Sequence, residues 1–330
     1  MKKNKILEWL LEEDNPSVRY FTLKGLLEKR ENDAEVKAAK KLIMKKGAVA
    51  KILAGQKKEG CWDEPKKFYR SKYKGTTWQL IILAELGADA EDERIKKACE
   101  FILKHSQDKE SMGFSVDYSV TAGCGAHSFV VPCLTGNMIW SLIRLGYLED
   151  RRVKGAIGYI TKYQRFDDKD ALLPDIWPYN RYRMCFGEHT CHMGAVKALR
   201  ALAEIPPEMR SREVKEKIKQ GAEYFLKHHI YRRSHNLEKI GRPGWLHLGF
   251  PLMYQSDILE ILDILTSLGY KDERMDDAVK VLLSKRTGTG KWLLENTFNG
   301  RYQVNIETRG KPSKWLTLRA LKVLKRMGKT

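Results

Sequence analysis

Four cysteine and histidine side chains fall in two short segments that together could hold a metal ion. Cys133 lies in the first segment, and the adjacent Cys191 and His192 lie in the second, with Cys185 just upstream. Thiolate and imidazole are ligands that tetrahedral Zn²⁺ prefers, so Cys133, Cys191 and His192 predict a zinc site with one position open for a substrate or water. Cys185 as a fourth ligand would make the site closed and structural. Since no Cys-x-x-Cys pair occurs, the alternative is that these cysteines are buried small residues and the histidine caps a helix.

A carboxylate and several cations elsewhere in the chain could also act on a substrate. Asp257 follows a serine at an expected helix start and is the best-placed carboxylate for acid–base chemistry. The same position would equally stabilise the positive end of the helix dipole. Basic residues expected in or near loops could bind a diphosphate or a carboxylate, or could be solvated surface charges. These residues are Arg181, Arg183, Arg232, Arg233 and Lys314.

The scaffold for these residues is indicated by an internal repeat. Segments with helical spacing of apolar residues end in Leu-Gly at Gly87, Gly146 and Gly269, and the first two glycines lie about 60 positions apart. A further copy over 192–203 lacks the glycine. An acidic or polar turn and a second helix-like segment follow each copy, and acidic residues favour the N-terminal end of a helix. The repeat therefore predicts a series of helical hairpins.

Six expected starts of first helices carry serine or threonine, the residues that favour N-cap positions. They are Ser17, Thr76, Thr135, Thr190, Ser256 and Ser313. Only five pairs are complete, so we expect the terminal helices, 5–13 and 314–327, to form a sixth pair. The expected fold is all-α, an (α/α)6 toroid closed by the N- and C-terminal helices, as a single domain over residues 1–330. An open solenoid is the alternative, but its end helices would have polar faces, and these two are apolar.

In such a ring the N-terminal ends of the inner helices meet at one mouth, where the predicted metal ligands would lie together. The net charge of +19 permits an acidic substrate, anionic lipid or nucleic acid as partner, although lysines spread over most helices suit a solvated surface as well. No strong nucleic-acid motif occurs. Without an apolar leader or a membrane-spanning run, we expect a cytoplasmic protein, with peripheral membrane contact left open. The Lys- and Glu-rich composition is typical of thermophilic proteins.

The hairpin repeat and two turns, Gly-Cys-Trp at 60–62 and Gly-Lys-Trp at 290–292, resemble the α/α-toroid superfamily of terpenoid cyclases and protein prenyltransferase β-subunits. The resemblance covers essentially the whole chain and implies an enzyme with its site at the mouth of the ring. Two signatures are missing. The Asp-x-Asp-Asp motif of cyclases is replaced by Asp-Asp-Lys-Asp at 167–170, and the Asp-x-Cys zinc motif of prenyltransferases does not occur.

The metal pattern is similar to that of a third toroid group, the lanthionine synthetase-like cyclases. These have a cysteine near the start of one inner helix and Cys-His-Gly at the next. Cys133, Cys191 and His192 match the three ligands, whereas Met193 is inserted before Gly194. The resemblance implies a zinc ion that binds a substrate thiol as the thiolate and so makes it a nucleophile at neutral pH.

Three functions remain open from the sequence. The leading hypothesis is a Zn-dependent toroid enzyme, prenyltransferase- or cyclase-like, that activates a thiol or prenyl-type substrate. The substrate would be a small molecule or peptide, held through its anionic groups by the basic residues. A second hypothesis is a metal-free toroid similar to terpenoid cyclases or acidic-polysaccharide lyases. The third is a non-enzymatic helical-repeat binding scaffold with a structural metal.

Overall fold

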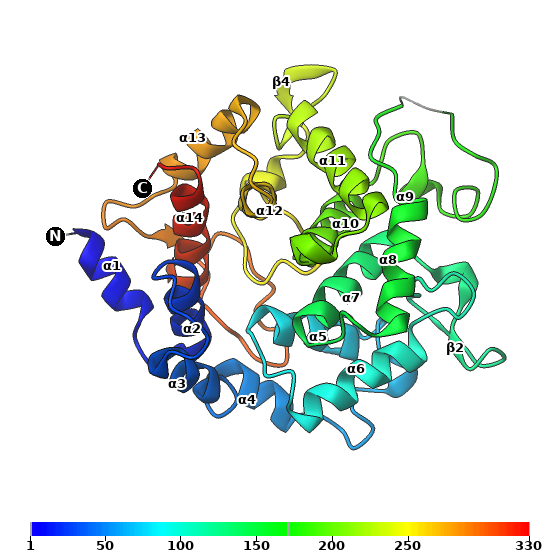
Figure 1. The fold of residues 1–330 in the computed structure, drawn as a ribbon, viewed down its shortest axis with the longest axis horizontal. Coiled ribbons are helices and arrows are strands. Elements are labelled where there is room, and N and C mark those ends of the chain that lie inside the picture. The colour runs from blue at the N-terminus through cyan, green and yellow to red at the C-terminus, as the bar shows by residue number, and fades with distance from the viewer. Residues whose placement is uncertain (1, 170–171, 330) are drawn as a thin grey trace.

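The computed structural model describes residues 2–169 and 172–329, and its helices form a ring of hairpins, an (α/α)6 toroid (Figure 1). Six helices line the inside: α2 (Pro16–Gly25), α5 (Thr76–Glu85), α7 (Pro132–Arg144), α10 (His192–Glu204), α12 (Ile258–Ser267) and α14 (Lys314–Arg326). The outer helices are α1 (Lys2–Leu10), α3 (Ala34–Ile43), α4 (Gly47–Ala54), α6 (Glu93–His105), α8 (Arg151–Tyr163), α11 (Arg212–Lys227) and α13 (Asp276–Ser284). The predicted fold class is thus confirmed.

Inner and outer helices differ in how they bury their residues. All ten residues of α5 are buried, because its sequence is apolar on every side and neighbours surround it. Outer helices such as α6 bury one face only, begin with an acidic cap at Asp92 and carry basic residues in the last turn. The inner helix α5 is therefore buried on all sides, whereas the outer helix α6 keeps one face toward solvent.

The two ends of the chain meet and close the ring, as the sequence predicts. Helix α14 packs between α12 and α2, and α1 packs against α14. Ile6 and Leu10 of α1 are buried in the core. Lys314, the first residue of α14, forms ion pairs with Glu12 and Asp14, which follow α1. The terminal helices thus complete the sixth pair.

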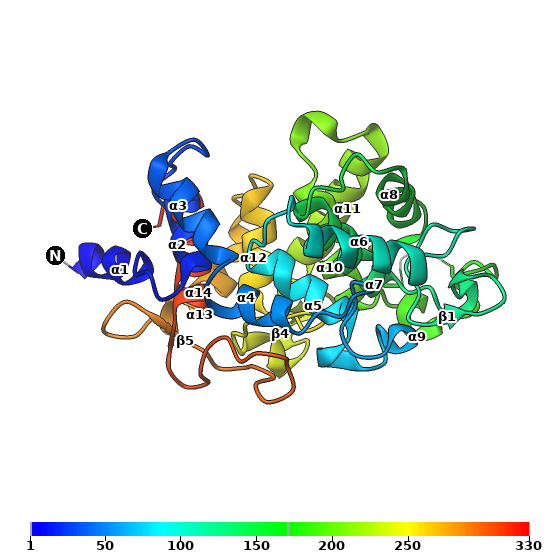
Figure 2. The same cartoon turned by 90° about the horizontal axis from the view of Figure 1, so that it is seen from below.

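The two mouths of the ring are built from connections of different length (Figure 2). Short turns join the inner helices α2, α5, α7, α10 and α12 to the outer helices that follow them. Long segments lead from the outer helices α4, α6, α8, α11 and α13 to the next inner helix, whereas α1 is joined to α2 by a short connection. The long segments hold the three two-stranded antiparallel sheets: β1 (Tyr118–Ser119) with β2 (Cys124–Gly125), β3 (Arg232–Arg233) with β4 (Asn236–Ile240), and β5 (Trp292–Leu293) with β6 (Pro312–Ser313). They also hold the short helix α9 (Arg183–Phe186) and the 3-10 turns Pro65–Lys67, Lys72–Lys74, His127–Phe129 and Pro243–Leu246. The short-turn side holds Pro207–Met209 and Glu273–Met275.

Threonines in the first turns of inner helices fix these long segments. The hydroxyl of Thr76 accepts the N–H of Trp62 at 3.0 Å, and that of Thr135 accepts the N–H of Phe114 at 2.9 Å. Both threonines therefore lie inside their helices, and their predicted N-cap role is wrong. Their hydroxyls accept N–H groups of the preceding loop, and that of Thr135 also donates to the carbonyl of Val131 at the start of its own helix.

The other predicted caps differ in outcome. Ser313 does cap α14, because its hydroxyl accepts the N–H of Leu316 at 2.9 Å. The cap of α2 is Asn15, not Ser17, and the cap of α12 is Asp257, not Ser256. Within the described residues, no helix has the length and apolar character that crossing a membrane requires.

Candidate functional site

The axis of the ring is closed at the long-segment mouth by residues 249–256, which we call the plug. The Phe250 ring stacks on Trp315 with centroids 4.5 Å apart, and the Tyr254 ring lies 4.6 Å from that of Trp78. The amide of Asn137 donates to the carbonyl of Met253 at 3.5 Å. This is the mouth where the sequence places the chemistry. The plug fills the axis there with buried side chains, and the placement of the chemistry at this mouth stays a prediction.

The axial pocket lies at the opposite mouth, among the C-terminal ends of the inner helices. Its volume is about 290 Å³, and all six inner helices contribute to its lining. Phe21, Trp140 and Trp315 supply aromatic surface. Five cations and three carboxylates also line it: Arg144, Arg200, Arg319, Lys322 and Arg326, with Glu85, Glu204 and Asp263. The lining therefore carries two positive charges in excess.

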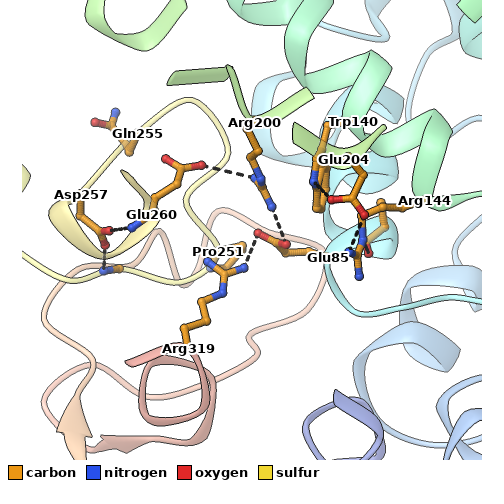
Figure 3. Close-up of polar contacts among 12 residues, drawn as sticks. Glu85, Trp140, Arg144, Arg200, Glu204, Pro251, Gln255, Asp257, Glu260 and Arg319 are labelled. Carbon is orange, nitrogen blue, oxygen red and sulfur yellow. Dashed lines mark hydrogen bonds and ion pairs between the residues drawn. The ribbon is translucent and has the colours of Figure 1, made fainter. Parts of the chain in front are cut away.

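The floor of the axial pocket is an ion cluster of Glu85, Arg200 and Arg319 (Figure 3). One carboxylate oxygen of Glu85 lies 2.7 Å from Arg200 Nη2, and the other lies 2.7 Å from Arg319 Nη2. The guanidinium of Arg200 also lies 3.6 Å from the centroid of Trp140. Burial by itself would raise the pKa of Glu85, but the charges of Arg200 and Arg319 outweigh burial and hold that pKa well below its usual range. The floor is therefore fixed and ionised.

The floor continues along the ring axis toward the plug. Arg200 Nη1 lies 3.4 Å from Glu260 Oε1, and Glu260 in turn pairs with the fully buried Lys197 at 2.6 Å. Lys197 also donates to the carbonyl of Gln255 in the plug at 2.8 Å. Buried charges are tolerated when each is paired, as here. This series of polar contacts links the pocket to the plug.

The rim of the axial pocket is formed by two further ion pairs. Arg144 lies 3.1 Å from Glu204, whose other oxygen accepts the indole N–H of Trp140 at 3.1 Å. Arg326 lies 2.6 Å from Asp263. These side chains remain about a quarter to a third exposed, so solvent reaches them. Each rim carboxylate is thus already paired with a guanidinium.

Lys322 is the remaining cation of the lining. Within residues 2–169 and 172–329, no carboxylate lies within 4.0 Å of its Nζ, unlike the four arginines. The pKa of Lys322 is lowered, chiefly because burial disfavours the charged amine. Asp263 acts to raise this pKa, whereas Arg326, Arg144 and Arg319 lower it further. The amine of Lys322 is therefore the basic group of the lining that is free of a close carboxylate among the described residues.

The predicted zinc ligands do not assemble into a metal site. Cys133, Cys185 and Cys191 are electrostatic neighbours, and burial followed by repulsion from the other two raises the pKa of Cys133 well above its usual range. His192, however, stacks on Trp245 with ring centroids 3.7 Å apart, and burial lowers its pKa to about 3. The part of the chain that the structure describes contains no group of three or more His, Cys, Asp or Glu side chains able to hold a metal ion. The residues present do not fit a zinc ion, and we derive no chemistry from one.

Asp257 holds the plug against α12. Its Oδ2 accepts the N–H of Gly249 at 2.9 Å, and its Oδ1 accepts the N–H of Glu260 at 2.8 Å. Burial raises the pKa of Asp257 to about 6, although these two backbone donors act in the opposite direction. Asp257 is not part of the lining of the axial pocket. Its position explains a capping role, and its acid–base role stays a prediction.

The predicted substrate-binding cations also lie away from the axial pocket. Arg232 pairs with Asp277 at 2.6 Å, and Lys314 pairs with residues that follow α1. Arg181, Arg183 and Arg233 are exposed on the long-segment side. Their role in binding a substrate stays a prediction. They do not contribute to the ion clusters described above.

The pocket residues that the sequence analysis missed do leave a signal. Glu85 ends a helix that is otherwise apolar on all sides, and Arg200 interrupts a run of alanine and leucine in α10. A charged residue in a helix surrounded by protein must find a buried partner. Charges inside inner-type helices therefore mark the axis of the ring better than cysteines at the helix starts.

Comparison with known proteins places the chain by its fold. No protein-family model matches the sequence, and no curated protein matches it. A glycoside hydrolase of family 105 from C. acetobutylicum has a similar structure, with a TM-score of 0.50, 13% identity, and coverage of 99% of this chain and 100% of that chain. An unsaturated glucuronyl hydrolase specific for heparin has a TM-score of 0.48 at 12% identity, with coverage of 96% of this chain and 85% of that chain. A type II terpene cyclase from Scytonema has a TM-score of 0.43 at 14% identity, with coverage of 98% of each chain. At these identities the likeness shows the fold alone, and that fold is the α/α toroid.

Proposed function

We propose that this protein is an enzyme that acts on a small organic anion, bearing a carboxylate or a phosphate, in the axial pocket. The observation that carries the proposal is the excess of two positive charges on a pocket whose floor is fixed by buried ion pairs. Cations held in place before a ligand arrives stabilise an anion without reorganising, and the partly desolvated setting strengthens the attraction.

The size and surface of the pocket favour a compact, polar molecule. Its volume of about 290 Å³ is near the lower end of the roughly 300–1,000 Å³ that is usual for small-molecule sites. A long prenyl chain would need an apolar tunnel, whereas this lining alternates ion pairs with aromatic rings. Guanidinium groups recognise carboxylate and phosphate in a bidentate manner. A sugar acid of one ring fits these properties, so the substrate class we propose is an acidic saccharide or a similar hydroxy acid.

The reaction we propose is hydrolysis or elimination at such a saccharide, without a metal. In elimination, neutralising the carboxylate of the substrate by fixed cations favours the negative charge that develops on the neighbouring carbon. In hydrolysis, the same cations bind and orient the acid group while positive charge develops on the sugar ring. Lys322 and Arg326 line the pocket from α14, and Arg144 approaches from α7. Asp263 and Glu204 are the carboxylates within the same lining. Each is held by a guanidinium, so in this reaction they would accept a proton rather than donate one.

Binding of galacturonate and galactose, measured by isothermal titration calorimetry, tests the proposal because the two sugars differ by one carboxylate. We expect galacturonate alone to bind, with an affinity that falls as salt is added. Lys322→Met should weaken binding by about tenfold to a hundredfold, since a hydrogen bond to a charged group contributes about 1.5–3 kcal/mol.

Lys325→Met is the matched control on the same helix. Lys325 donates to the carbonyl of Leu26 and pairs with Glu28 outside the pocket, so this change should leave affinity unaltered. Equal binding of the two sugars, or no binding of galacturonate, phosphate and sulfate, would overturn the proposal.

A further inference from the structure

Among the residues that the structure describes, the amine of Lys322 has no ion-pair partner, whereas each arginine of the axial pocket has one. We propose that Lys322 is a carbonyl-reactive amine, which condenses with the aldehyde or keto group of a small oxo acid held in the axial pocket. The inference rests on the proposed function, because the neighbouring arginines must hold the acid group. It goes further in assigning a covalent step and a substrate class with both a carboxylate and a carbonyl.

The stem of Lys322 is held by a close approach of two inner helices. A Cβ atom placed on Gly25 of α2 would lie only 3.0 Å from Lys322 Cε. The absence of a side chain at Gly25 therefore lets the stem pass between α2 and α14. An amine fixed in this way loses less conformational entropy when it attacks a bound carbonyl.

The charges that face the amine come from three helices. Arg319 and Arg326 lie on α14 itself, Arg144 comes from α7, and Asp263 comes from α12. The single carboxylate of this set, Asp263, is bonded to Arg326 at 2.6 Å. Asp263 is therefore committed to the guanidinium, and the amine faces three cations that cannot lose a proton at neutral pH.

Only the neutral form of an amine attacks a carbonyl group, so this environment matters for the reaction. Desolvation first, and repulsion from the three arginines next, lower the pKa of Lys322 against the opposing effect of Asp263. Each unit of lowering increases the neutral fraction at neutral pH by about tenfold. The same arginines that bind the acid group thus activate the amine.

The proposed condensation releases one water molecule and needs no other reactant. The Nζ lone pair forms a bond to the carbonyl carbon, the C=O π electrons move to oxygen, and oxygen takes up a proton from the nitrogen to give a carbinolamine. Loss of the hydroxyl as water forms the C=N bond of an imine. One amine and one carbonyl group therefore become one imine and one water, and no oxidant or reductant is consumed.

Trapping with sodium cyanoborohydride tests the step on the full-length protein. Glyoxylate, the smallest oxo acid, is incubated with the protein and the reductant, and the modified lysines are located by peptide mass spectrometry. We expect carboxymethyl addition at Lys322 well before Lys325, and we expect galacturonate to protect Lys322. Acetaldehyde, which lacks the carboxylate, should show a clearly smaller preference for Lys322. Lys322→Arg should abolish the preferred adduct, whereas Lys325→Arg should preserve it.

The outcomes separate this inference from the proposed function. If galacturonate or glyoxylate binds but Lys322 is labelled no faster than Lys325, the covalent inference is overturned and the proposed anion site stands. If no anion binds and labelling is uniform, both are overturned. Because Lys322→Arg keeps the positive charge, loss of the adduct with retained anion binding in this variant can only reflect loss of the amine.

Discussion

The two mouths of the ring differ in what occupies the ring axis. At the long-segment mouth the plug fills the axis with packed aromatic side chains such as Phe250 and Tyr254. At the short-turn mouth the axis is lined by ion pairs around Glu85 and stays open as the axial pocket. Long connections have enough chain to fold inward, whereas turns of a few residues do not. The difference teaches that the position of a pocket in a ring fold depends on connection length as much as on the helix ends.

The largest expected effect comes from breaking the floor of the axial pocket. Glu85→Gln would leave Arg200 and Arg319 without their shared carboxylate, and breaking a buried pair in this way costs about 3–5 kcal/mol. We expect that loss in the free energy of unfolding, measured by urea denaturation. Glu204→Gln at the exposed rim is the control and should cost at most about 1 kcal/mol. Equal losses for the two variants would contradict the distinction between floor and rim.

The plug should give the molecule a specific dependence on pH. Asp257 has a pKa of about 6 in the folded chain, above the roughly 3.9 of an exposed aspartate. The folded state therefore binds this proton more tightly, so the stabilisation is complete below about pH 4 and is lost as the pH rises to about 6. The difference amounts to about 3 kcal/mol.

Asp257→Asn should remove that component while keeping an acceptor at the cap. The free energy of unfolding of the parent protein and of the variant is measured between pH 4 and pH 7. The difference between the two is then plotted against pH, because contributions from Glu85 and the other carboxylates are common to both proteins and cancel. A difference curve without slope in this window would show that Asp257 is ionised throughout.

The smallest expected effect separates the two mouths directly. Cys133 and Cys191 lie at the long-segment mouth, outside the lining of the axial pocket. The variants Cys133→Ser and Cys191→Ser should therefore bind galacturonate with an affinity within about twofold of that of the parent protein. Zinc content, measured by elemental analysis, accompanies the binding assay. About one zinc per chain, lost in both variants, would restore the predicted metal site at the mouth closed by the plug.

The architecture could be read from the sequence because it depends on local periodicity. The Leu-Gly endings at Gly87 and Gly146 mark the ends of inner helices, and the apolar terminal segments indicate closure. Residues 249–256 give no comparable signal, since nothing in their spacing says that the loop folds into the axis. The pocket could not be predicted for a related reason. Glu85 and Arg200 lie 115 positions apart, and only closure of the ring brings them together.

The cysteine pattern shows where spacing alone misleads. Cys133 and Cys191 do become neighbours, as a ring requires of residues at successive inner helix starts. The direction of His192 depends instead on Trp245, a residue from a different long segment that stacks on the imidazole. Side-chain direction is a property of tertiary packing, so three residue types at favourable positions do not define a coordination sphere.

Closure by the two ends also constrains the order in which the molecule can form. Helix α14 is made nearly 300 residues after α2, its neighbour on one side. The ion pairs of Glu12 and Asp14 can likewise form only after Lys314 has been synthesised. The first hairpin therefore spends most of synthesis with an uncovered apolar flank. Contacts of such long sequence separation slow folding, so the ring is expected to close late, after its other hairpins have stacked.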